Sequence, residues 1–214
     1  MSGEAHPLPT GRAHLAALTA PLAALDADVD RVDAWGRHLA TVLVAGGRLL
    51  AAGNGGSAAQ AQHLTSELVG RYRDDRPAYS ALALHAETSA LTAITNDYGA
   101  DQAFARQVSA HGRAGDVMVA ISTSGRSRNV VAAVQEARRA GLVTWALTGR
   151  VPNPLARAVD DVVAVDAPAT ATVQEIHQIV VHLLCAAVDT ELAAGRMRPT
   201  QRGRLRTATM GGGS

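Results

Sequence analysis

The chain has 214 residues, of which 47% are hydrophobic, and its formal net charge is +1. This length suffices for one sizeable core, and the charge gives no reason to expect a nucleic acid or an acidic partner. All 20 lysine-or-arginine positions are arginine, which excludes Schiff-base chemistry, a pyridoxal-phosphate lysine and a Walker-type lysine. Any phosphate group must therefore be bound by backbone N–H groups, hydroxyls or arginine.

The cysteine content and the lengths of the apolar runs indicate the cellular compartment in which we expect the protein. A single cysteine, Cys185, cannot make a disulfide within the chain, which suits a reducing compartment. The opening residues lack a basic segment followed by an apolar one, so we expect no secretory signal. No apolar run reaches about 18 residues, so we expect no membrane span and a cytoplasmic protein.

The first part of the chain is predicted to be helical. Residues 13–46 are rich in alanine and leucine at helical spacing. Pro21 is expected to divide them into a short helix and a longer one near residues 26–45. Residues 1–12 are expected to be an N-terminal extension.

Short apolar runs then alternate with amphipathic stretches, which predicts βαβ units and an α/β fold with a parallel sheet covered on both faces. Residues 13–195 are expected to form one domain. Residues 196–214 are interpreted as a disordered basic tail rather than as an arm that binds nucleic acid. The expected strands are residues 48–53, 79–84, 116–122, 142–149 and 161–166, and the expected helices lie near 57–70, 101–112, 127–140 and 172–194.

Two of these strands end in loops suited to phosphate. Glycine lets the backbone approach an anion, and the helix that follows offers free N–H groups and a partial positive charge. In a parallel sheet such loops lie at the carboxyl ends of the strands, where ligands bind. The alternative is that the serines and threonines only cap helices. The residues concerned are Asn54, Gly55, Gly56 and Ser57 in "GNGGSAAQ", and Ser122, Thr123, Ser124 and Ser127 around Gly125 in "ISTSGRSRNV".

A histidine and a glutamate follow the first loop. His63 and Glu67 are four residues apart and share a face of the expected helix. Alone, such a pair is typical of a protein surface, and His182 on the last helix is typical of a buried core histidine. Gln174 and His182 are eight residues apart, about 12 Å along a helix, so they meet at one metal only by stretching or with help from a second subunit.

Four stretches carry a resemblance to a known family. "GNGGSAAQAQHLTSELVGRY", "TNDYG", "ISTSGRSRNV" and "TVQEIHQIVVHLL" resemble, in order, the motifs of sugar isomerase (SIS) domains, and among them those of phosphoheptose isomerases. The resemblance covers roughly residues 30–194. It implies an αβα sandwich with a five-stranded parallel sheet, preceded by helices that assemble a homotetramer with active sites at subunit interfaces.

The resemblance also implies roles for individual residues. It makes His63, Glu67, Gln174 and His182 the ligands of a zinc ion, with Glu67 as the catalytic base and His182 as the acid. Asn96 and Asp97, which alone suggest only a turn, would hold substrate hydroxyls. The full set expected to bind substrate is Asn54, Gly55, Gly56, Ser57, Glu67, Asn96, Asp97, Ser122, Thr123, Ser124, Ser127 and Gln174.

These features favour an enzyme that converts sedoheptulose 7-phosphate to D-glycero-D-manno-heptose 7-phosphate by way of an enediol, feeding heptose synthesis. Ala171 departs from the family pattern, because some family members carry an aspartate at this position. This difference leaves open which sugar phosphate the chain prefers. The rival hypothesis is a non-catalytic SIS-domain protein that binds a replication initiator or senses phosphosugars. Retention of both the His63–Glu67 pair and the Gln174–His182 pair favours the enzyme.

Overall fold

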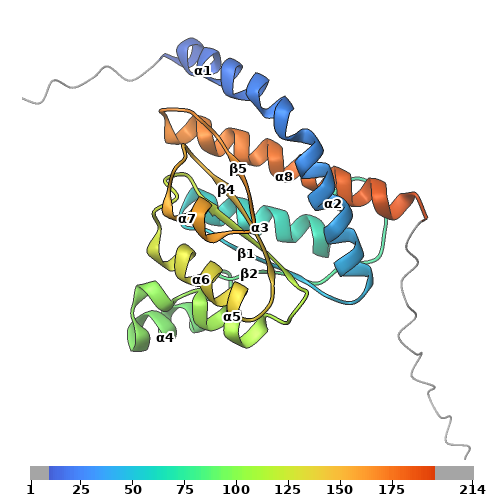
Figure 1. Cartoon of the computed structure of the whole chain (residues 1–214), viewed down its shortest axis with the longest axis vertical. Helices are drawn as coiled ribbons and strands as arrows, with labels where there is room; N and C mark the ends of the chain where they lie inside the picture. Colours follow the sequence, from blue (N-terminus) through green and yellow to red (C-terminus); the bar gives the residue numbers. More distant parts are fainter. Residues whose placement is uncertain (1–9, 196–214) are drawn as a thin grey trace, which may run out of the picture.

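The computed structural model of the chain describes residues 10–195. These residues form a single parallel sheet with helices on both faces (Figure 1). The elements are α1 (Gly11–Ala24), η1 (Leu25–Asp28), α2 (Val29–Val44), β1 (Leu49–Ala52), α3 (Gly56–Val69), β2 (Ala81–Ala83), α4 (Thr88–Tyr98), η2 (Ala100–Gln102), α5 (Ala105–His111), β3 (Val117–Ser122), α6 (Arg128–Arg139), β4 (Val143–Thr148), α7 (Pro154–Ala158), β5 (Asp161–Ala164) and α8 (Thr170–Ala193).

The sheet confirms the expected α/β fold. Its five strands are all parallel, in the order β2-β1-β3-β4-β5, and each lies within a predicted range. The order reverses between β1 and β3, because β2 pairs on one side of β1 and the remaining strands extend on the other. In open α/β sheets, ligands bind outside the carboxyl ends of the strands at such a reversal.

Two sequence predictions about helices were wrong or incomplete. Pro21 lies inside α1 instead of ending it, and the chain bends at η1, where Leu25 becomes buried. Proline removes one backbone donor, and the helix continues for three more residues past that loss. Helices α4 and α7 were not predicted, and Asn96 and Asp97 lie in the last turn of α4 rather than in a simple turn.

The core has two parts, one on each face of the sheet. Successive strand residues point to opposite faces, so Val117 and Val119 of β3 face α2, α3 and α8, while Met118 and Ala120 face α5, α6 and α7. On the first face, Trp35 of α2 stacks on Trp145 of β4 with ring centroids 4.9 Å apart. The strands are therefore apolar on both faces, as the continuous apolar runs predicted.

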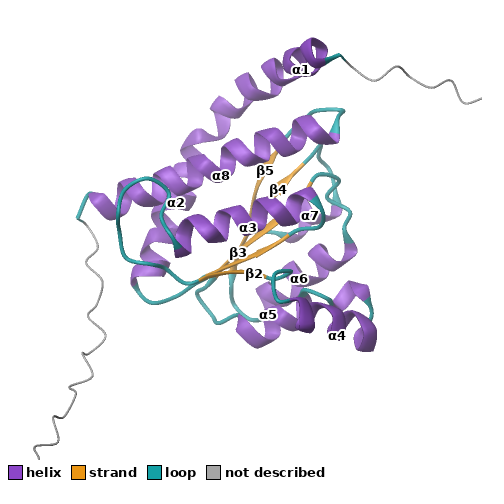
Figure 2. Cartoon of the chain, turned by 180° about the vertical axis from the view of Figure 1, so that it is seen from behind, coloured by secondary structure: helices purple, strands orange, loops and turns teal. Residues whose placement is uncertain are grey.

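The composition of helix α8 resembles that of a membrane span. Among the described residues it is the one helix long and apolar enough to cross a membrane, with a mean hydropathy of 1.3. More than half of that window, 56%, is buried inside the domain. Packing against α2, α3 and the sheet accounts for this apolar character (Figure 2).

Candidate active site

The loops that follow β1 and β3 flank the reversal of strand order. Asn54 in the first loop and Asn129 in the first turn of α6 donate to each other's side-chain oxygens, both at 2.9 Å. Gly55, with φ of +55°, precedes α3, and neither α3 nor α6 has a side chain that caps its N-terminus. Backbone or side-chain oxygens already accept from Ser57 and Ala58 in α3 and from Val130 in α6. Within residues 10–195, the N–H groups of Gly56, Arg128 and Asn129 have no recorded partner and are left for an anion.

The hydroxyl-rich loop is built partly from buried groups. Ser122 is only 4% exposed, and its Oγ lies 3.1 Å from the Oγ of Ser127. Ser127 stands at the N-cap of α6, yet its hydroxyl makes no capping bond, so the capping interpretation is wrong for this residue. Thr123 is half-buried and Ser124 is exposed, so only part of the hydroxyl set faces solvent.

A buried network supports this loop from behind. The Thr148 hydroxyl donates to the Ser122 carbonyl at 2.9 Å, and the Asn153 amide donates to the Thr148 hydroxyl at 3.1 Å. His177 of α8 donates from Nε2 to the Thr148 carbonyl at 3.1 Å. Burial lowers the pKa of His177 to about 4, so this imidazole is neutral and its Nε2 carries the donated proton.

The histidine and glutamate that follow the first loop meet the last helix. His63 Nε2 lies 3.0 Å from Glu67 Oε1 and 3.3 Å from His182 Nε2. Helices α3 and α8 run side by side, which brings the three side chains together within one chain (Figure 2). All three are partly open to solvent, with the His63 side chain 39% and the Glu67 side chain 20% exposed.

Two neighbours of this cluster were missed by the sequence analysis. Gln178 Nε2 lies 3.2 Å from His182 Nε2, and the Tyr72 ring centroid lies 5.7 Å from that of His182. Gln178 is four residues before His182, so the i, i+4 rule for helices could have found it. Tyr72 comes from an irregular loop, for which no periodicity gives a signal.

Gln174 lies apart from this cluster. Its amide faces the start of α3, because a Cβ added at Gly56 would lie 2.4 Å from Gln174 Nε2. Its backbone carbonyl accepts a hydrogen bond from the Gln60 amide. The eight-residue separation from His182 thus persists in the folded chain, and Gln174 lies by the first phosphate loop rather than beside His63.

Asn96 and Asp97 make no recorded contact with the cluster or with the two loops within residues 10–195. Asn96 and Asp97 are exposed, and the Asn96 amide donates to Asp97 at 2.8 Å. Ser57 is buried at the start of α3, 4% exposed. Arg71 is exposed and bonds to the Arg73 carbonyl of its own loop, at 2.9 Å.

The donor atoms of the cluster suit zinc in kind but not in their present spacing. Two imidazole nitrogens and a carboxylate oxygen are ordinary zinc ligands, and tetrahedral bonds near 2.1 Å separate such donors by about 3.4 Å. The separations of 3.0 and 3.3 Å are those of a direct ion pair and a hydrogen bond, and both are shorter than that figure. Within residues 10–195, no group of three His, Cys, Asp or Glu side chains is arranged to hold a metal ion.

Known proteins are similar to this chain in sequence and in fold. A family model for the SIS domain matches residues 14–149. The phosphoheptose isomerase of Streptomyces coelicolor is 60% identical over 190 residues, which are 89% of this chain and 81% of that protein. Two solved structures each cover 84% of this chain and 96% of their own: phosphoheptose isomerase GmhA from Neisseria gonorrhoeae, with a TM-score of 0.77 and 40% identity, and a phosphoheptose isomerase from Francisella tularensis, with a TM-score of 0.79 and 33% identity. The chain therefore belongs to the phosphoheptose isomerase family of SIS-domain proteins, which are sugar-phosphate isomerases.

Proposed function

We propose that this isomerase interconverts sedoheptulose 7-phosphate and D-glycero-D-manno-heptose 7-phosphate through an enediol. The observation that carries the proposal is the meeting of His63, Glu67 and His182 between α3 and α8, on the same chain as a phosphate loop. Relatives named phosphoheptose isomerase support the substrate class.

In this proposal His63, Glu67 and His182 hold a zinc ion, and Gln174 is the fourth ligand. When bound, zinc supplies Lewis-acid polarisation of a substrate oxygen. Gln174 lies with Gly56 at the start of α3, so it reaches such an ion only with a change of side-chain position or from a second copy of the chain. A homotetramer with sites at its interfaces satisfies the second condition.

The shape of the N-terminal helix supports assembly. Helix α1 has no buried residue, although it is rich in alanine and leucine, and Leu15 and Leu22 are 67% and 48% exposed. Packing of this apolar surface against other copies would remove it from water. A closed tetramer with D2 symmetry is the simplest such assembly.

The chemistry needs one base and one acid. Glu67 and His182 would each be both ligand and proton carrier, so substrate binding would have to loosen their bonds to a bound metal. Glu67 takes a proton from carbon 1 of the ketose while His182 donates a proton to the oxygen on carbon 2, which gives the enediol. The proton held by Glu67 then returns to carbon 2, and the hydroxyl proton on carbon 1 leaves to His182, which gives the aldose. Both residues end in their starting protonation states.

The phosphate is bound at the other end of the site. Ser124 is exposed beside the N-terminus of α6, where the Arg128 and Asn129 N–H groups have no recorded partner within residues 10–195, and the Asn54 side chain bonds to that of Asn129. With no lysine in the chain, neutral donors and a helix N-terminus carry this task.

The experiment is an isomerase assay on the purified protein with sedoheptulose 7-phosphate, with and without a chelator. Formation of the heptose 7-phosphate that is lost on chelation and restored by zinc supports the proposal. Turnover that survives complete metal removal overturns the zinc part. Phosphosugar binding without turnover in zinc-loaded protein would favour a sensor, and no reaction with this ketose would overturn the substrate.

A further inference from the structure

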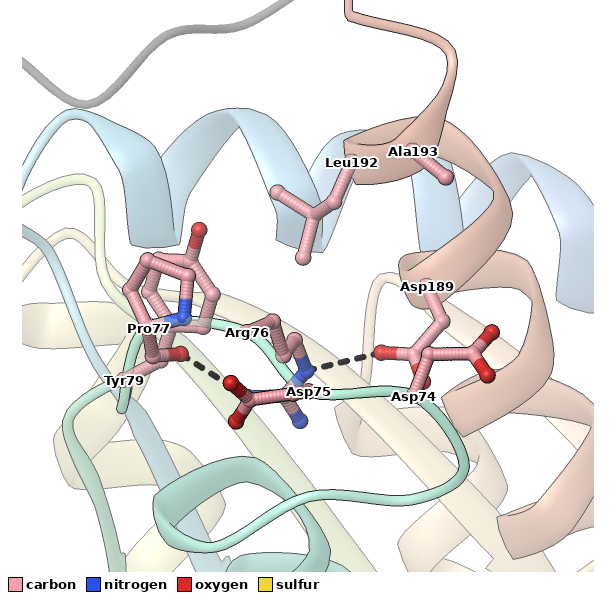
Figure 3. Close-up of a pocket in the computed structure, with 8 residues that line it drawn as sticks. All are labelled: Asp74, Asp75, Arg76, Pro77, Tyr79, Asp189, Leu192 and Ala193. Carbon is pink, nitrogen blue, oxygen red and sulfur yellow. Dashed lines mark hydrogen bonds and ion pairs between the residues drawn. The ribbon is translucent and has the colours of Figure 1, made fainter.

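One arginine touches both of the helices that carry the proposed ligands, yet none of the motifs includes it. Arg76 lies in the loop between α3 and β2, and its side chain is only 9% exposed. Its Nε donates to Asp189 Oδ1 of α8 at 2.8 Å (Figure 3). The two side chains border a hollow of about 230 Å³ that Tyr79, Leu192 and Ala193 also line.

The other donors of the same guanidinium reach the end of α3. Arg76 Nη2 donates to the Glu67 carbonyl at 2.6 Å, and Nη1 donates to the Leu68 carbonyl at 3.0 Å. The last carbonyls of a helix have no partner within it, and a cation there also opposes the partial negative charge of the helix end. Arg76 thus holds the backbone of Glu67 itself.

Asp189, which accepts the bond from Arg76 Nε, lies on α8, the helix that carries His182. It lies seven residues, or two turns, after His182, so both residues share a face of α8. Asp189 is 15% exposed, so the pair with Arg76 is largely buried, and buried ion pairs are costly to break on one side. The planar guanidinium of Arg76 makes two hydrogen bonds to α3 and one to α8. It therefore fixes the distance between the C-terminal end of α3 and α8.

We propose that Arg76 and Asp189 are positioning residues that set the spacing of α3 and α8, and so the geometry in which His63 and Glu67 meet His182. We call this pair the interhelical brace. The inference rests on the proposed function for the ligand set, but the spacing of the helices can be measured without metal or substrate. Tyr72, whose ring lies beside His182, belongs to the loop that Arg76 anchors.

The test compares Arg76→Met, which removes every bond of the fork, with Asp189→Asn, which removes the charge and keeps the shape. The matched control is Asp116→Asn, since Asp116 is a buried carboxylate beside Arg48 that accepts two backbone N–H bonds away from α3 and α8. Should Arg76→Met fail to fold, Asp189→Asn alone decides the outcome. Purified full-length chains are used throughout.

The first measurement is a distance in the metal-free protein. Spin labels at Ser66→Cys on α3 and Thr190→Cys on α8, both exposed positions, report the interhelical distance when labelled chains are diluted with unlabelled ones. We expect a narrow distribution in the parent and in Asp116→Asn, and a broader or shifted one in both brace variants. An unchanged distribution in the brace variants overturns the proposal, whatever the protein does with zinc.

The second measurement is zinc affinity, by competition with a chromophoric chelator. Loss of a group that supports metal ligands costs roughly 10- to 100-fold in affinity. We expect such a loss for Arg76→Met, a smaller one for Asp189→Asn, and none for Asp116→Asn although its melting temperature falls. Equal zinc affinity in all folded variants would mean that the interhelical brace only stabilises the fold, and it would overturn the proposal that the pair positions the ligands. A parent protein that binds no zinc overturns the proposed function instead, and the distance measurement still decides the brace.

Discussion

The two parts of the candidate site are built in different ways. The hydroxyl loop at residues 122–127 is held by its own turn, with Gly125 at φ of +61° and Ser122 bonded to Ser127, and by the Thr148 hydroxyl of the neighbouring strand β4. The cluster of His63, Glu67 and His182 exists only because α3 and α8 pack side by side. The loop should therefore tolerate changes in helix packing, and the cluster should tolerate changes in the loop. Four predictions test that separation, from the largest expected effect to the smallest.

Glu67→Gln should have the largest effect, on turnover and on zinc binding rather than on the phosphate loop. The amide cannot act as a base, and loss of a general base typically costs on the order of 10² to 10⁴ in rate. Phosphosugar affinity at the loop should change little. Steady-state kinetics and calorimetry measure the two quantities. The control is Glu136→Gln, since Glu136 accepts a bond from Ser109 on the opposite face of the sheet. Near-parental turnover would remove Glu67 from the mechanism.

The pH dependence of stability should reveal the titration of His177, the α8 residue that bonds to Thr148 behind the hydroxyl loop. Its pKa is about 4 in the folded protein against an ordinary 6.5, because burial disfavours the charged form. As the pH falls from 6.5 toward 4, the unfolded chain gains a proton that the folded chain does not, so the free energy of unfolding falls. The loss should reach about 3 kcal/mol near pH 4.

Denaturant unfolding across that pH range measures this loss. His177→Gln cannot titrate and keeps an amide that can reach the Thr148 carbonyl, so its stability should vary less with pH. His111→Gln, on an exposed position of α5, should follow the parent. Equal pH dependence in the parent and in His177→Gln would show that another group titrates.

Gly125→Ala should damage the loop and leave the cluster intact. A Cβ at this glycine would lie 2.1 Å from the Asn153 side chain, which would have to move, and the positive φ adds strain. Together these should cost on the order of 1–3 kcal/mol of stability and weaken phosphosugar binding. Gly115→Ala is the matched control, because φ there is +87° but no atom lies within 4 Å of the added Cβ. Equal losses in both variants would assign the effect to backbone strain alone.

The parts of the molecule differed in how far the sequence predicted them. Continuous apolar runs gave all five strands, because strands buried on both faces need apolar residues throughout. The contact of His63 with Glu67 was accessible because i, i+4 spacing is local. The contact of His63 with His182 depends on the crossing of two helices, and sequence spacing alone does not fix it. Arg76 was missed for the same reason, since its partners are backbone carbonyls and a residue 113 positions away.

The smallest effect should come from the serines, and here the structure changes the expectation. Ser122 and Ser124 both belong to the set expected to bind substrate, but Ser122 is buried against Ser127 and only Ser124 is exposed. Ser124→Ala should thus weaken phosphosugar binding by a few fold without lowering the melting temperature. Ser122→Ala should lower both, because it leaves the half-buried Ser127 hydroxyl without this partner, at a cost of about 1 kcal/mol. Calorimetric titration and thermal unfolding of each variant measure the pair. If Ser124→Ala binds as tightly as the parent, the loop holds phosphate through its backbone N–H groups and not through this hydroxyl.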